Sequence, residues 1–397
     1  MKVLVINCGS SSVKYQLIET SDGFVLAKGL VERIGFDNAV FSHKPCRGES
    51  RKSTLPVKDH TVAIAYVLEA LTGENGVVSS LDEIGAVGHR FVNGGIDFQE
   101  TVVADDAVLT GIRKILNLAP LHNPAHLLGI EAAIAAMPDT PQVIVFDTGF
   151  HARMKPHAYQ YALPYEYYEN YGIRRYGFHG TSHYYVSHRA AELAGRPLED
   201  MRIITCHLGN GCSIDAVKDG WAVDTSMGFT PLEGLMMGTR TGDIDPAAVL
   251  YIMKKEGIDA ESMDTLLNKK SGLLGFTGIS PDMREIMAAA QSGDTRAATA
   301  IDMYCYRIKK YIGAYTGILG GLDALVFTAG VGEHSPVIRA KSVEGLGFLG
   351  VGVDPAKNAA AIGGEHDIST DSASVTTFVI PTNEEIVIAR EAERVLS

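Results

Sequence analysis

The sequence has few cysteines and no long apolar run. Its five cysteines, which include no C-x-x-C pair, are Cys8, Cys46, Cys206, Cys212 and Cys305. An odd number without such spacing excludes a complete disulfide framework and a four-cysteine zinc ribbon. No apolar stretch approaches the roughly 20 residues that cross a bilayer, and the N-terminal run 3–6 is too short for a signal peptide. We therefore expect a cytoplasmic protein.

The chain also lacks an excess of positive charge and several familiar catalytic motifs. Its 35 Lys and Arg residues and 47 Asp and Glu residues give a net charge of −12. Non-specific binding to nucleic acid or to a membrane surface needs a basic field, so we expect neither partner. The sequence contains no Gly-Lys-Ser/Thr and no Gly-x-Ser-x-Gly. This excludes a P-loop nucleotide site and leaves a serine hydrolase without support.

The order of elements indicates an α/β protein with two similarly built halves. Length predicts two or three domains. Two stretches read as strand, polar turn, strand: residues 3–6, 7–12 and 13–18, and residues 202–206, 207–212 and 213–217. A repeat at half the chain length favours two domains over a solenoid. The best boundary lies near 148–151, and we expect the terminal helix 383–396 to pack back on the first half.

Helix starts are marked by a capping residue that precedes proline. These pairs are Asp245-Pro246, Ser280-Pro281 and Ser335-Pro336. Residues 294–320 have the apolar period of one long helix. Short apolar runs that suit covered strands lie at 84–87, 143–146, 325–327 and 375–380.

Three short segments combine glycine with groups that suit a phosphate. The turn Asn7–Lys14 offers backbone N–H groups, serine hydroxyls and the Lys14 ammonium. The segment His207–Ser213 contains Asn-Gly, a strong hairpin signal. In Phe327–Ser335 a strand leads to a glycine turn and a capped helix, whose N-terminus favours an anion. Ordinary hairpins explain the first two equally well, and the third is only half of a dinucleotide fingerprint.

Four cationic or imidazole side chains, Arg90, His122, His179 and Arg240, lie in loops punctuated by glycine or proline. Arginine suits phosphate because its planar fork donates two hydrogen bonds. Any one of the four is more typical of a surface charge or a buried histidine, but together they favour an anion site. The pairs His122/His126 and His179/His183 have zinc-like i, i+4 spacing, but neither encloses a glutamate and no third ligand is evident.

Carboxylates at two places suggest a magnesium site. Asp147 ends a strand, where α/β proteins place ligand contacts, and Glu384 and Glu385 open the last helix. Thr382 and Glu385 have the spacing of a capping box, which leaves Glu384 to point elsewhere. Asp147 and Glu384 would suit Mg²⁺ together with water and substrate phosphate.

Together these motifs resemble the acetate kinase family, from residue 2 to about 392. The matching segments are Asn7–Lys14, His89–Gly95, Leu121–Pro124, Phe146–Gly149, Tyr176–His183, His207–Ser213, Asp224–Pro246, Phe327–Pro336 and Pro381–Arg390. The resemblance implies two duplicated domains of the actin/sugar-kinase/Hsp70-like (ribonuclease H-like) fold, with the active-site cleft between them. These domains are residues 1–150 plus 384–397 and residues 151–383. It further implies a homodimer that converts ATP and acetate into ADP and acetyl phosphate, with Mg²⁺ or alternatively Mn²⁺.

The resemblance also implies roles for individual residues. Asn7 and Glu384 resemble the family's Mg²⁺ positions, and Lys14, with Ser10 and Ser12 of the same turn, its phosphate contacts. The segments similar to the nucleotide site contain His207, Leu208, Gly209, Asn210, Gly211, Asp282, Met283, Arg284, Gly330, Val331, Gly332, Glu333 and His334. Arg90 resembles the contact to the substrate carboxylate. His179 and Arg240 resemble transition-state stabilisers, with His122 beside them. The residues that resemble the family's small apolar pocket for the methyl group are Val92, Leu121, Phe178 and Pro231.

The chemistry agrees with this resemblance. A carboxylate ionises near pH 4 and is a nucleophile at pH 7 without a general base. Family convention makes Asp147 a proton acceptor; we expect it instead to orient a metal-bound water or a catalytic side chain. A propionate kinase or other short-chain acid kinase is the nearest alternative. Two further alternatives are a nucleotide-gated scaffold of the same superfamily and a sugar or glycerol kinase. A sugar or glycerol kinase would need a base for the substrate hydroxyl and a larger polar pocket.

Overall fold

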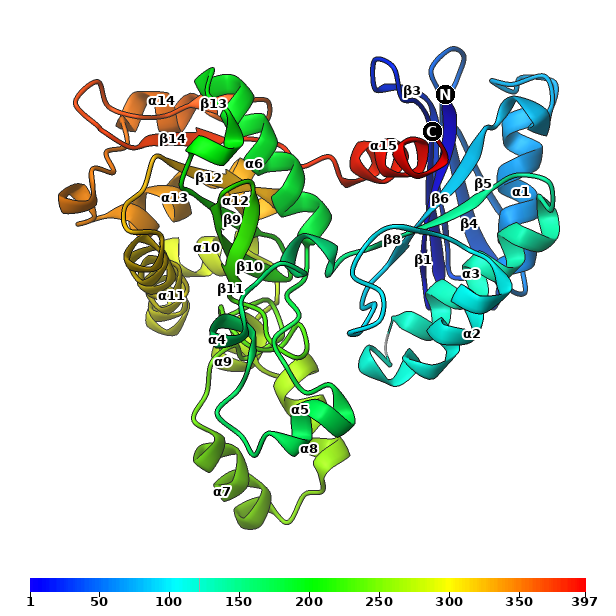
Figure 1. Cartoon of the computed structure of the whole chain (residues 1–397). Coiled ribbons are helices and arrows are strands. Elements are labelled where there is room, and N and C mark those ends of the chain that lie inside the picture. Colours follow the sequence, from blue (N-terminus) through cyan, green and yellow to red (C-terminus); the bar gives the residue numbers. More distant parts are fainter. Residues whose placement is uncertain (121) are drawn as a thin grey trace. The chain divides into compact units, whose positions relative to one another are not determined.

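The chain forms two compact units in a computed structural model that describes residues 1–120 and 122–397. Unit 1 comprises Met1–Ala152 and Asn383–Ser397, and unit 2 comprises Arg153–Thr382 (Figure 1). Each unit is built on one sheet with helices, so the predicted α/β class is confirmed. Within these residues no helix has the length and apolarity that a membrane crossing requires. All five cysteines are free thiols, four of them buried.

Unit 1 contains an eight-stranded sheet in the order β5-β4-β3-β2-β1-β6-β8-β7. Its strands are β1 (Lys2–Gly9), β2 (Ser12–Glu19), β3 (Phe24–Glu32), β4 (Phe36–Pro45), β5 (Arg51–Val57), β6 (Ala86–Phe91), β7 (Val102–Val103) and β8 (Gln142–Phe146). β1 pairs antiparallel with β2 and parallel with β6, and β6 pairs parallel with β8. The carboxyl ends of β1, β6 and β8 therefore meet at one edge, where ligands of α/β proteins bind.

The first predicted turn is shorter in the structure than in the sequence-based prediction. β1 continues to Gly9, which pairs with Ser12, so the predicted turn at 7–12 shrinks to the two exposed residues between them. Asn7 stays on the strand, opposite Lys14. The strand continues because β2 supplies backbone partners as far as Gly9.

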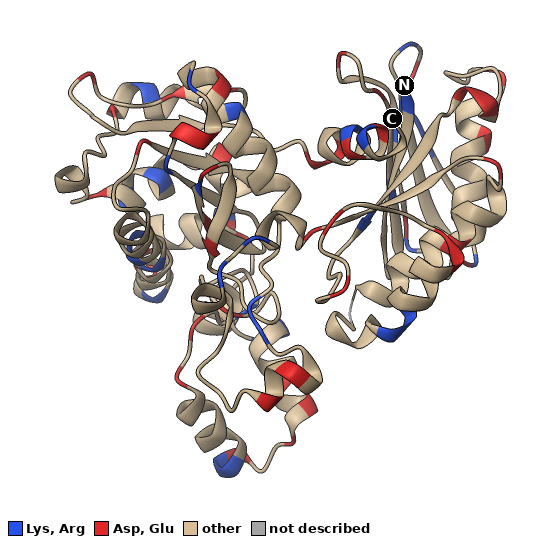
Figure 2. Ribbon diagram, in the orientation of Figure 1, with Lys and Arg blue, Asp and Glu red and all other residues tan. Residues whose placement is uncertain are grey.

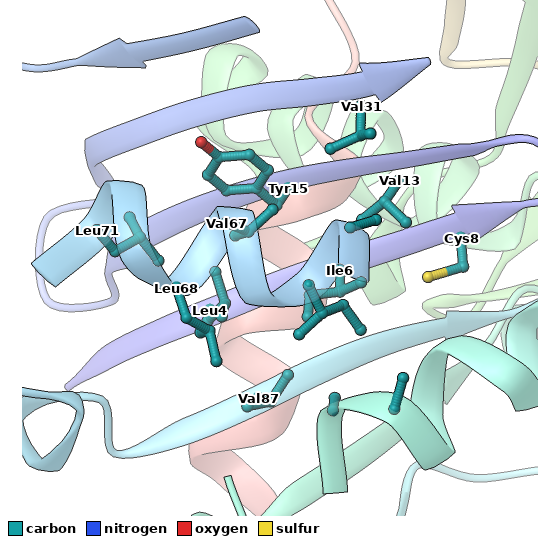
Figure 3. Packing of buried hydrophobic residues seen from close by; sticks show 14 of the residues in the cluster. Leu4, Ile6, Cys8, Val13, Tyr15, Val31, Val67, Leu68, Leu71 and Val87 are labelled. Carbon is teal, nitrogen blue, oxygen red and sulfur yellow. The ribbon is translucent and has the colours of Figure 1, made fainter. Parts of the chain in front are cut away.

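Helices cover both faces of the unit 1 sheet. They are α1 (His60–Thr72), α2 (Asp106–Lys114), α3 (Asn123–Ala136) and α15 (Glu384–Leu396), with 3-10 turns η1 (Leu81–Glu83), η2 (Leu116–Leu118) and η3 (Gly149–His151). α1 and α3 share a core with β1 and β2 that includes Leu4, Ile6, Val13, Val67 and Val87 (Figure 3). Gly88 faces away from this core, and a Cβ there would meet Ile388 of α15. The predicted return of the terminal helix to the first half is confirmed.

The predicted capping box at the start of α15 is wrong. Asn383, not Thr382, caps the helix, because its side chain accepts a hydrogen bond from the Ile386 N–H at 3.2 Å. The Thr382 hydroxyl donates instead to Ser182 Oγ in unit 2. Glu385 forms an ion pair with Lys14. Asn caps a helix as well as Ser or Asp does, so the choice between adjacent candidates depends on tertiary contacts.

Unit 2 repeats the strand order of unit 1. Its sheet runs β11-β10-β9-β12-β14-β13, with β9 (Ile203–Leu208), β10 (Cys212–Lys218), β11 (Trp221–Thr225), β12 (Ala324–Thr328), β13 (His366–Asp367) and β14 (Thr376–Val379). β9, β10 and β11 form an antiparallel meander, β9 pairs parallel with β12, and β12 pairs parallel with β14. β3-β2-β1-β6-β8 has the same arrangement in unit 1. The prediction of two duplicated halves is confirmed by this shared topology.

Unit 2 carries most of the helices. They are α4 (Pro156–Tyr159), α5 (Glu166–Tyr171), α6 (Gly180–Ala194), α7 (Pro246–Glu256), α8 (Ala260–Lys269), α9 (Gly272–Thr277), α10 (Met283–Gln291), α11 (Thr295–Leu319), α12 (Ala329–His334), α13 (Pro336–Val343) and α14 (Pro355–Ala360), with η4 (Leu198–Asp200) and η5 (Gly347–Leu349). The predicted caps at Asp245 and Ser335 are confirmed. So is the long predicted helix, which is capped by Asp294 and Gly320.

Two local predictions in unit 2 are wrong. No helix starts at Pro281: α10 starts two residues later, because Asp282 caps it by accepting from the Arg284 N–H. The expected glycine turn after β12 is the short helix α12, which contains both Gly330 and Gly332. Ala329 makes the sharp change of direction at φ +63° in place of a glycine.

Candidate active site

Acidic and basic residues are interspersed along both units (Figure 2). The overall charge distribution therefore does not indicate an anion site, and individual side chains must be considered instead. In unit 1 they gather at a small pocket lined by Val5, Asn7, Lys14, Tyr15, Arg90, Glu384, Glu385 and Ile388. The pocket lies where β1, β2 and β6 meet the first turn of α15. It brings four predicted site residues together: Asn7, Lys14, Arg90 and Glu384.

Arg90 is held by carboxylates of its own unit. Its Nη2 lies 2.9 Å from Asp147 Oδ2, and its Nε lies 3.9 Å from Glu384 Oε2. Asp147 is fully buried at the end of β8, beside the strand that carries Arg90. Burial opposes the guanidinium charge, but these carboxylates outweigh it and raise the pKa of Arg90. The Asp147 carboxylate thus fixes the position of the Arg90 guanidinium.

Burial makes the negative charge of the Glu384 carboxylate costly. Burial raises its pKa to about 7; Arg90 opposes this shift, and the carboxylates of Asp147 and Glu385 add to it. The Asn7 side chain lines the same pocket. An amide oxygen and a carboxylate are the hard oxygen donors that Mg²⁺ accepts, with waters and phosphate completing its shell. The donor set fits the ion, although the described residues contain no cluster of three His, Cys, Asp or Glu that would form a full cage.

Apart from Lys14, the remaining predicted site residues of unit 1 are not among those that line this pocket. Lys14 is half exposed and paired with Glu385, so a phosphate would compete with that pair. Ser10 lies in the exposed turn, and the Ser12 hydroxyl lies over Gly9. Val92 is buried just beyond β6. His122 precedes α3, with its ring 6.5 Å from that of His126. Leu121 lies outside the described residues.

In unit 2, two predicted stabilising groups converge on one glycine. A Cβ built on Gly211 would lie 3.4 Å from Arg240 Nη1 and 3.5 Å from His179 Nε2. Both donors therefore border the space above the β9–β10 turn. No carboxylate of the described chain lies within ion-pair distance of Arg240, and burial lowers the pKa of its guanidinium. A half-buried cation without a carboxylate partner suits an incoming anion.

His179 is held in a strained and well-defined position. It precedes α6 with φ +59°, a region that side chains other than glycine rarely adopt. Its ring stacks on that of His207, with 4.0 Å between the ring centroids. Its Nδ1 lies 2.9 Å from Ser213 Oγ. The neighbouring Phe178 is buried.

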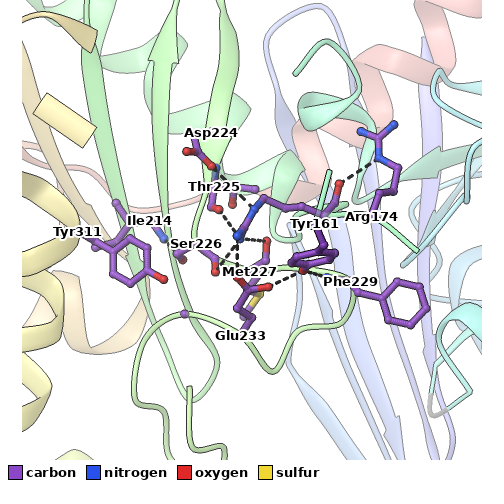
Figure 4. A network of polar contacts seen from close by, with 12 residues as sticks. Tyr161, Arg174, Ile214, Asp224, Thr225, Ser226, Met227, Phe229, Glu233 and Tyr311 are labelled. Carbon is purple, nitrogen blue, oxygen red and sulfur yellow. Dashed lines mark hydrogen bonds and ion pairs between the residues drawn. The ribbon is translucent and has the colours of Figure 1, made fainter. Parts of the chain in front are cut away.

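The sequence did not reveal the role of Arg175, which holds the loop that contacts Arg240. Arg240 Nη1 donates to the Pro231 carbonyl at 3.1 Å, so the loop 226–233 fixes where the guanidinium lies. Arg175 holds that loop: its Nη1 donates to three successive carbonyls, and its Nη2 donates to Glu233 at 2.6 Å. Tyr161 donates to the other oxygen of Glu233 (Figure 4). The contacts of Arg175 and Tyr161 join residues that are 50 to 72 positions apart in sequence, so no local pattern could have revealed them.

The three predicted nucleotide segments come together in unit 2. Gly209 of the first lies opposite Ala329, at the start of α12: a Cβ on Gly209 would lie 3.8 Å from the Ala329 Cβ. A Cβ on Gly238 would meet both the Asn210 side chain and the Pro281 carbonyl, which immediately precedes the second segment. In that segment Asp282 caps α10 and pairs with Arg284, while Met283 is buried. The third segment, Gly330–His334, lies within α12, where Arg339 donates to the carbonyls of Gly332 and Glu333.

The histidine pairs with zinc-like spacing have other roles. His183 Nδ1 lies 2.6 Å from Thr205 Oγ1, and its Nε2 lies 2.7 Å from Ser213 Oγ. His126 Nδ1 contacts the Arg90 carbonyl. Hydrogen bonds inside each unit thus involve the nitrogens that zinc would need.

Comparison with known proteins identifies the family. The sequence model of the Acetokinase family matches residues 2–390. An acetate kinase of Dictyoglomus thermophilum is 56% identical over 399 residues, which cover 100% of this chain and 99% of the relative. The chain belongs to the acetokinase family. The resemblance noted from the motifs is confirmed, and with it the prediction of a kinase that uses ATP and ADP.

Solved structures of acetokinase relatives have the same fold. The acetate kinase of Porphyromonas gingivalis superimposes with a TM-score of 0.95 at 47% identity, covering 100% of both chains. A propionate kinase from Francisella tularensis superimposes with a TM-score of 0.92 at 41% identity, covering 99% of both chains. The acetate kinase of Entamoeba histolytica reaches 0.89 at 32% identity and 99% coverage. The acetokinase fold therefore accommodates enzymes named for two different acids.

Proposed function

We propose that this acetokinase-family chain catalyses the reversible, Mg²⁺-dependent reaction of ATP with acetate to give ADP and acetyl phosphate. An acetate oxygen attacks the γ-phosphorus in line, the new O–P bond forms, and the bond to the β-phosphate oxygen breaks. ADP leaves with that electron pair. Acetate reacts as the anion, so the reaction has no proton for a general base to remove. The observation that carries the proposal is the convergence of Arg240 and His179 above Gly211.

Unit 2 supplies the nucleotide segments and the groups that stabilise the transition state. His207–Gly211, Asp282–Arg284 and Gly330–His334 bind ATP. Arg240 and His179 donate to the oxygens of the transferred phosphoryl group, where negative charge must be stabilised during an in-line transfer. The absence of a carboxylate partner for Arg240 among the described residues supports this role. Its charge is then available to the phosphoryl group.

Unit 1 supplies the metal and acid contacts. Asn7 and Glu384 would hold Mg²⁺, which when bound offsets the negative charge of the phosphates. Lys14, Ser10 and Ser12 contact phosphate. Arg90, kept in place by Asp147, binds the acetate carboxylate, and His122 lies beside the reacting groups. From the resemblance to the family, the residues proposed to select the methyl group are Val92 and Leu121, together with Phe178 and Pro231 of unit 2. The Asp147–Arg90 ion pair supports an orienting role for Asp147 instead of proton acceptance.

Propionate is the second candidate acid. The 41% identity and TM-score of 0.92 to a propionate kinase favour this alternative more than any other. Two curated relatives named acetate kinase reach 55–56% identity over 98–100% of the chain. We therefore propose acetate as the preferred acid.

The assembly and location are further parts of the proposal. We propose a cytoplasmic homodimer of chains whose residues 1–150 plus 384–397 and 151–383 are both actin-like ATPase domains. Unit 2 exposes several large apolar side chains that a second subunit would cover: Leu163, Tyr165, Tyr171, Leu250 and Tyr251. Light scattering after gel filtration measures the mass. A monomeric mass at micromolar concentration would contradict the dimer.

An acyl-phosphate trap tests the reaction. The protein is incubated with ATP, Mg²⁺, hydroxylamine and acetate, propionate or butyrate, and the hydroxamate is measured. We expect hydroxamate in the order acetate, propionate, butyrate, and ADP release that depends on the acid. ADP release without hydroxamate would indicate a nucleotide-gated scaffold, and phosphorylation of glycerol or a hexose would indicate a sugar kinase. More hydroxamate from propionate than from acetate would select the second candidate.

A further inference from the structure

A buried chain of hydroxyl and imidazole groups lies behind His179. Ser213 Oγ lies 2.9 Å from His179 Nδ1 and 2.7 Å from His183 Nε2. His183 Nδ1 lies 2.6 Å from Thr205 Oγ1, and its Nε2 lies 3.4 Å from Asp215 Oδ1. Ser213, His183, Thr205 and Asp215 are fully buried. Water therefore does not compete for these hydrogen bonds, and each partner constrains the next.

The sequence places these groups by two periodicities. His179, which immediately precedes α6, and His183 in its first turn are four residues apart, and 6.5 Å separates their ring centroids. Thr205 and His207 alternate along β9, and Ser213 and Asp215 alternate along β10, directly opposite them. Residues that pair across antiparallel strands share a face of the sheet. The face of β9 and β10 that meets α6 thus carries Thr205, Ser213 and Asp215, which contact the two histidines.

The position of each proton follows from the chemistry of these neighbours. The Asp215 carboxylate faces His183 Nε2, which favours a proton on that nitrogen over a lone pair. His183 Nε2–H then donates to Ser213 Oγ. A hydroxyl has a single proton, and Ser213 directs it to the second imidazole nitrogen within reach, His179 Nδ1. His179 accepts at Nδ1 and therefore carries its own proton on Nε2.

We propose that Ser213 is a positioning residue that fixes His179 in the tautomer with the proton on Nε2. His183 and Asp215 determine the direction in which the Ser213 hydroxyl donates its hydrogen bond. The inference rests on the proposed function, because it explains how His179 acts as a donor to the transferred phosphoryl group. His179 Nε2 borders the space above Gly211. In the other tautomer, a lone pair would face the negatively charged phosphoryl oxygens and repel them.

Removing the hydroxyl should change turnover more than substrate binding. In Ser213→Ala, His179 Nδ1 loses its donor, and both tautomers become accessible. We expect kcat to fall about 10–100-fold, the usual effect of removing a group that orients a functional histidine. KM for ATP and for acetate should change less than twofold, because the nucleotide segments and Arg90 are untouched. Ser213→Thr keeps a hydroxyl and should retain most of the activity.

A tautomer measurement tests the proposal without any substrate. Histidine is labelled with ¹⁵N, and the His179 ring resonances are assigned by their disappearance in His179→Asn. In the wild type we expect an unprotonated Nδ1 and a protonated Nε2. Ser213→Ala should lose this pattern, and Ser213→Thr should keep it. The matched control is Ser187→Ala on α6: its buried hydroxyl donates to the Tyr184 carbonyl, so its loss should leave tautomer and kcat unchanged.

Two results would overturn the proposal. One is a proton on His179 Nδ1 in the wild type, and the other is a Ser213→Ala protein with wild-type kcat and an unchanged His179 spectrum. Ser213→Ala in the His179→Asn background should cost nothing further; an additive loss would show that Ser213 acts by another route. If Ser213→Ala does not fold, Asp215→Asn tests the same chain. A wild type that shows the expected tautomer but forms no acyl phosphate would contradict the proposed function and leave the positioning role intact.

Discussion

Replacing Gly211 with alanine tests whether the space beside Arg240 and His179 is where the phosphoryl group reacts. Gly211 does not have a positive φ, so alanine adopts its backbone conformation without strain. The added methyl carbon would lie 3.4 Å from Arg240 Nη1 and 3.5 Å from His179 Nε2. These are ordinary contact distances, so the protein should fold. The same substitution also lowers the entropy of the unfolded chain, which favours the native state by about 0.4–1 kcal/mol.

The methyl group nevertheless occupies the space that the reaction needs. An oxygen that accepts from both donors must lie about 2.7–3.1 Å from each, which a carbon atom already at 3.4–3.5 Å from them prevents. Losing one such donor costs about 10²–10³ in kcat. We expect at least that loss in Gly211→Ala, measured in the hydroxamate assay at saturating ATP and acetate.

The control is the same change where the structure has room. Gly313 lies within α11, and a Cβ there meets nothing within 4 Å. Gly313→Ala should keep full activity and raise stability by about 0.5–1 kcal/mol, because glycine weakens a helix interior. A Gly211→Ala protein that unfolds normally and turns over within fivefold of the wild type would refute the placement of the reacting group.

Three further predictions concern Arg240 in unit 2 and Glu384 and His89 in unit 1. Arg240→Ala should lower kcat about 10²–10³-fold, and a loss below fivefold in steady-state kinetics would remove this residue from the transition state. Glu384→Gln should raise the Mg²⁺ concentration that gives half-maximal activity, since the pocket loses its carboxylate ligand; an unchanged Mg²⁺ titration would assign the metal to other residues. Burial lowers the pKa of His89 from 6.5 to about 4, so between these pH values the unfolded chain binds a proton that the folded chain excludes. Stability should fall as pH falls, by about 1.4 kcal/mol per pH unit from this group, and denaturant titrations of His89→Gln should lack that part of the slope.

Local signals in the sequence predicted local structure well. Asp294 and Gly320 mark both ends of the 25-residue α11, because each fixes a hydrogen-bonding pattern within its own turn. The two glycine hairpins were predicted for the same reason, and the equal strand order of the units confirms their duplication. Predictions failed where two adjacent residues could cap a helix. Asn383 caps α15 while Thr382 bonds to Ser182, a contact 200 residues away in sequence that no capping pattern contains.

In the candidate site, too, local sequence motifs identified the site residues but not the distant residues that hold them in place. Motif positions named four of the residues that line the pocket of unit 1, and both Arg240 and His179, which border Gly211 in unit 2. The residues that hold them were not predicted. Arg175 acts through the carbonyls of residues 225–227 and through Glu233, and Ser213 acts through a histidine on another element. Supporting residues of this kind have ordinary sequence surroundings, because their partners come from distant strands and loops.

The two arginines of the proposed site differ in a way that fits two different tasks. Arg90 is neutralised in advance by Asp147 at 2.9 Å and by Glu384 at 3.9 Å, so it holds a fixed geometry at little electrostatic cost. That state suits a contact to the acetate carboxylate. The negative charge of this group falls as its oxygen bonds to phosphorus, so the contact contributes to binding and does not strengthen in the transition state. Arg240 has no carboxylate partner in the described chain, only the Pro231 carbonyl and the Met237 sulfur. Its charge is uncompensated until an anion arrives, so its interaction strengthens as charge moves onto the phosphoryl oxygens. Substituting Arg90 should accordingly raise KM for acetate more than substituting Arg240, while substituting Arg240 should lower kcat more; the reverse pattern would show that the pairing state of an arginine does not determine its role.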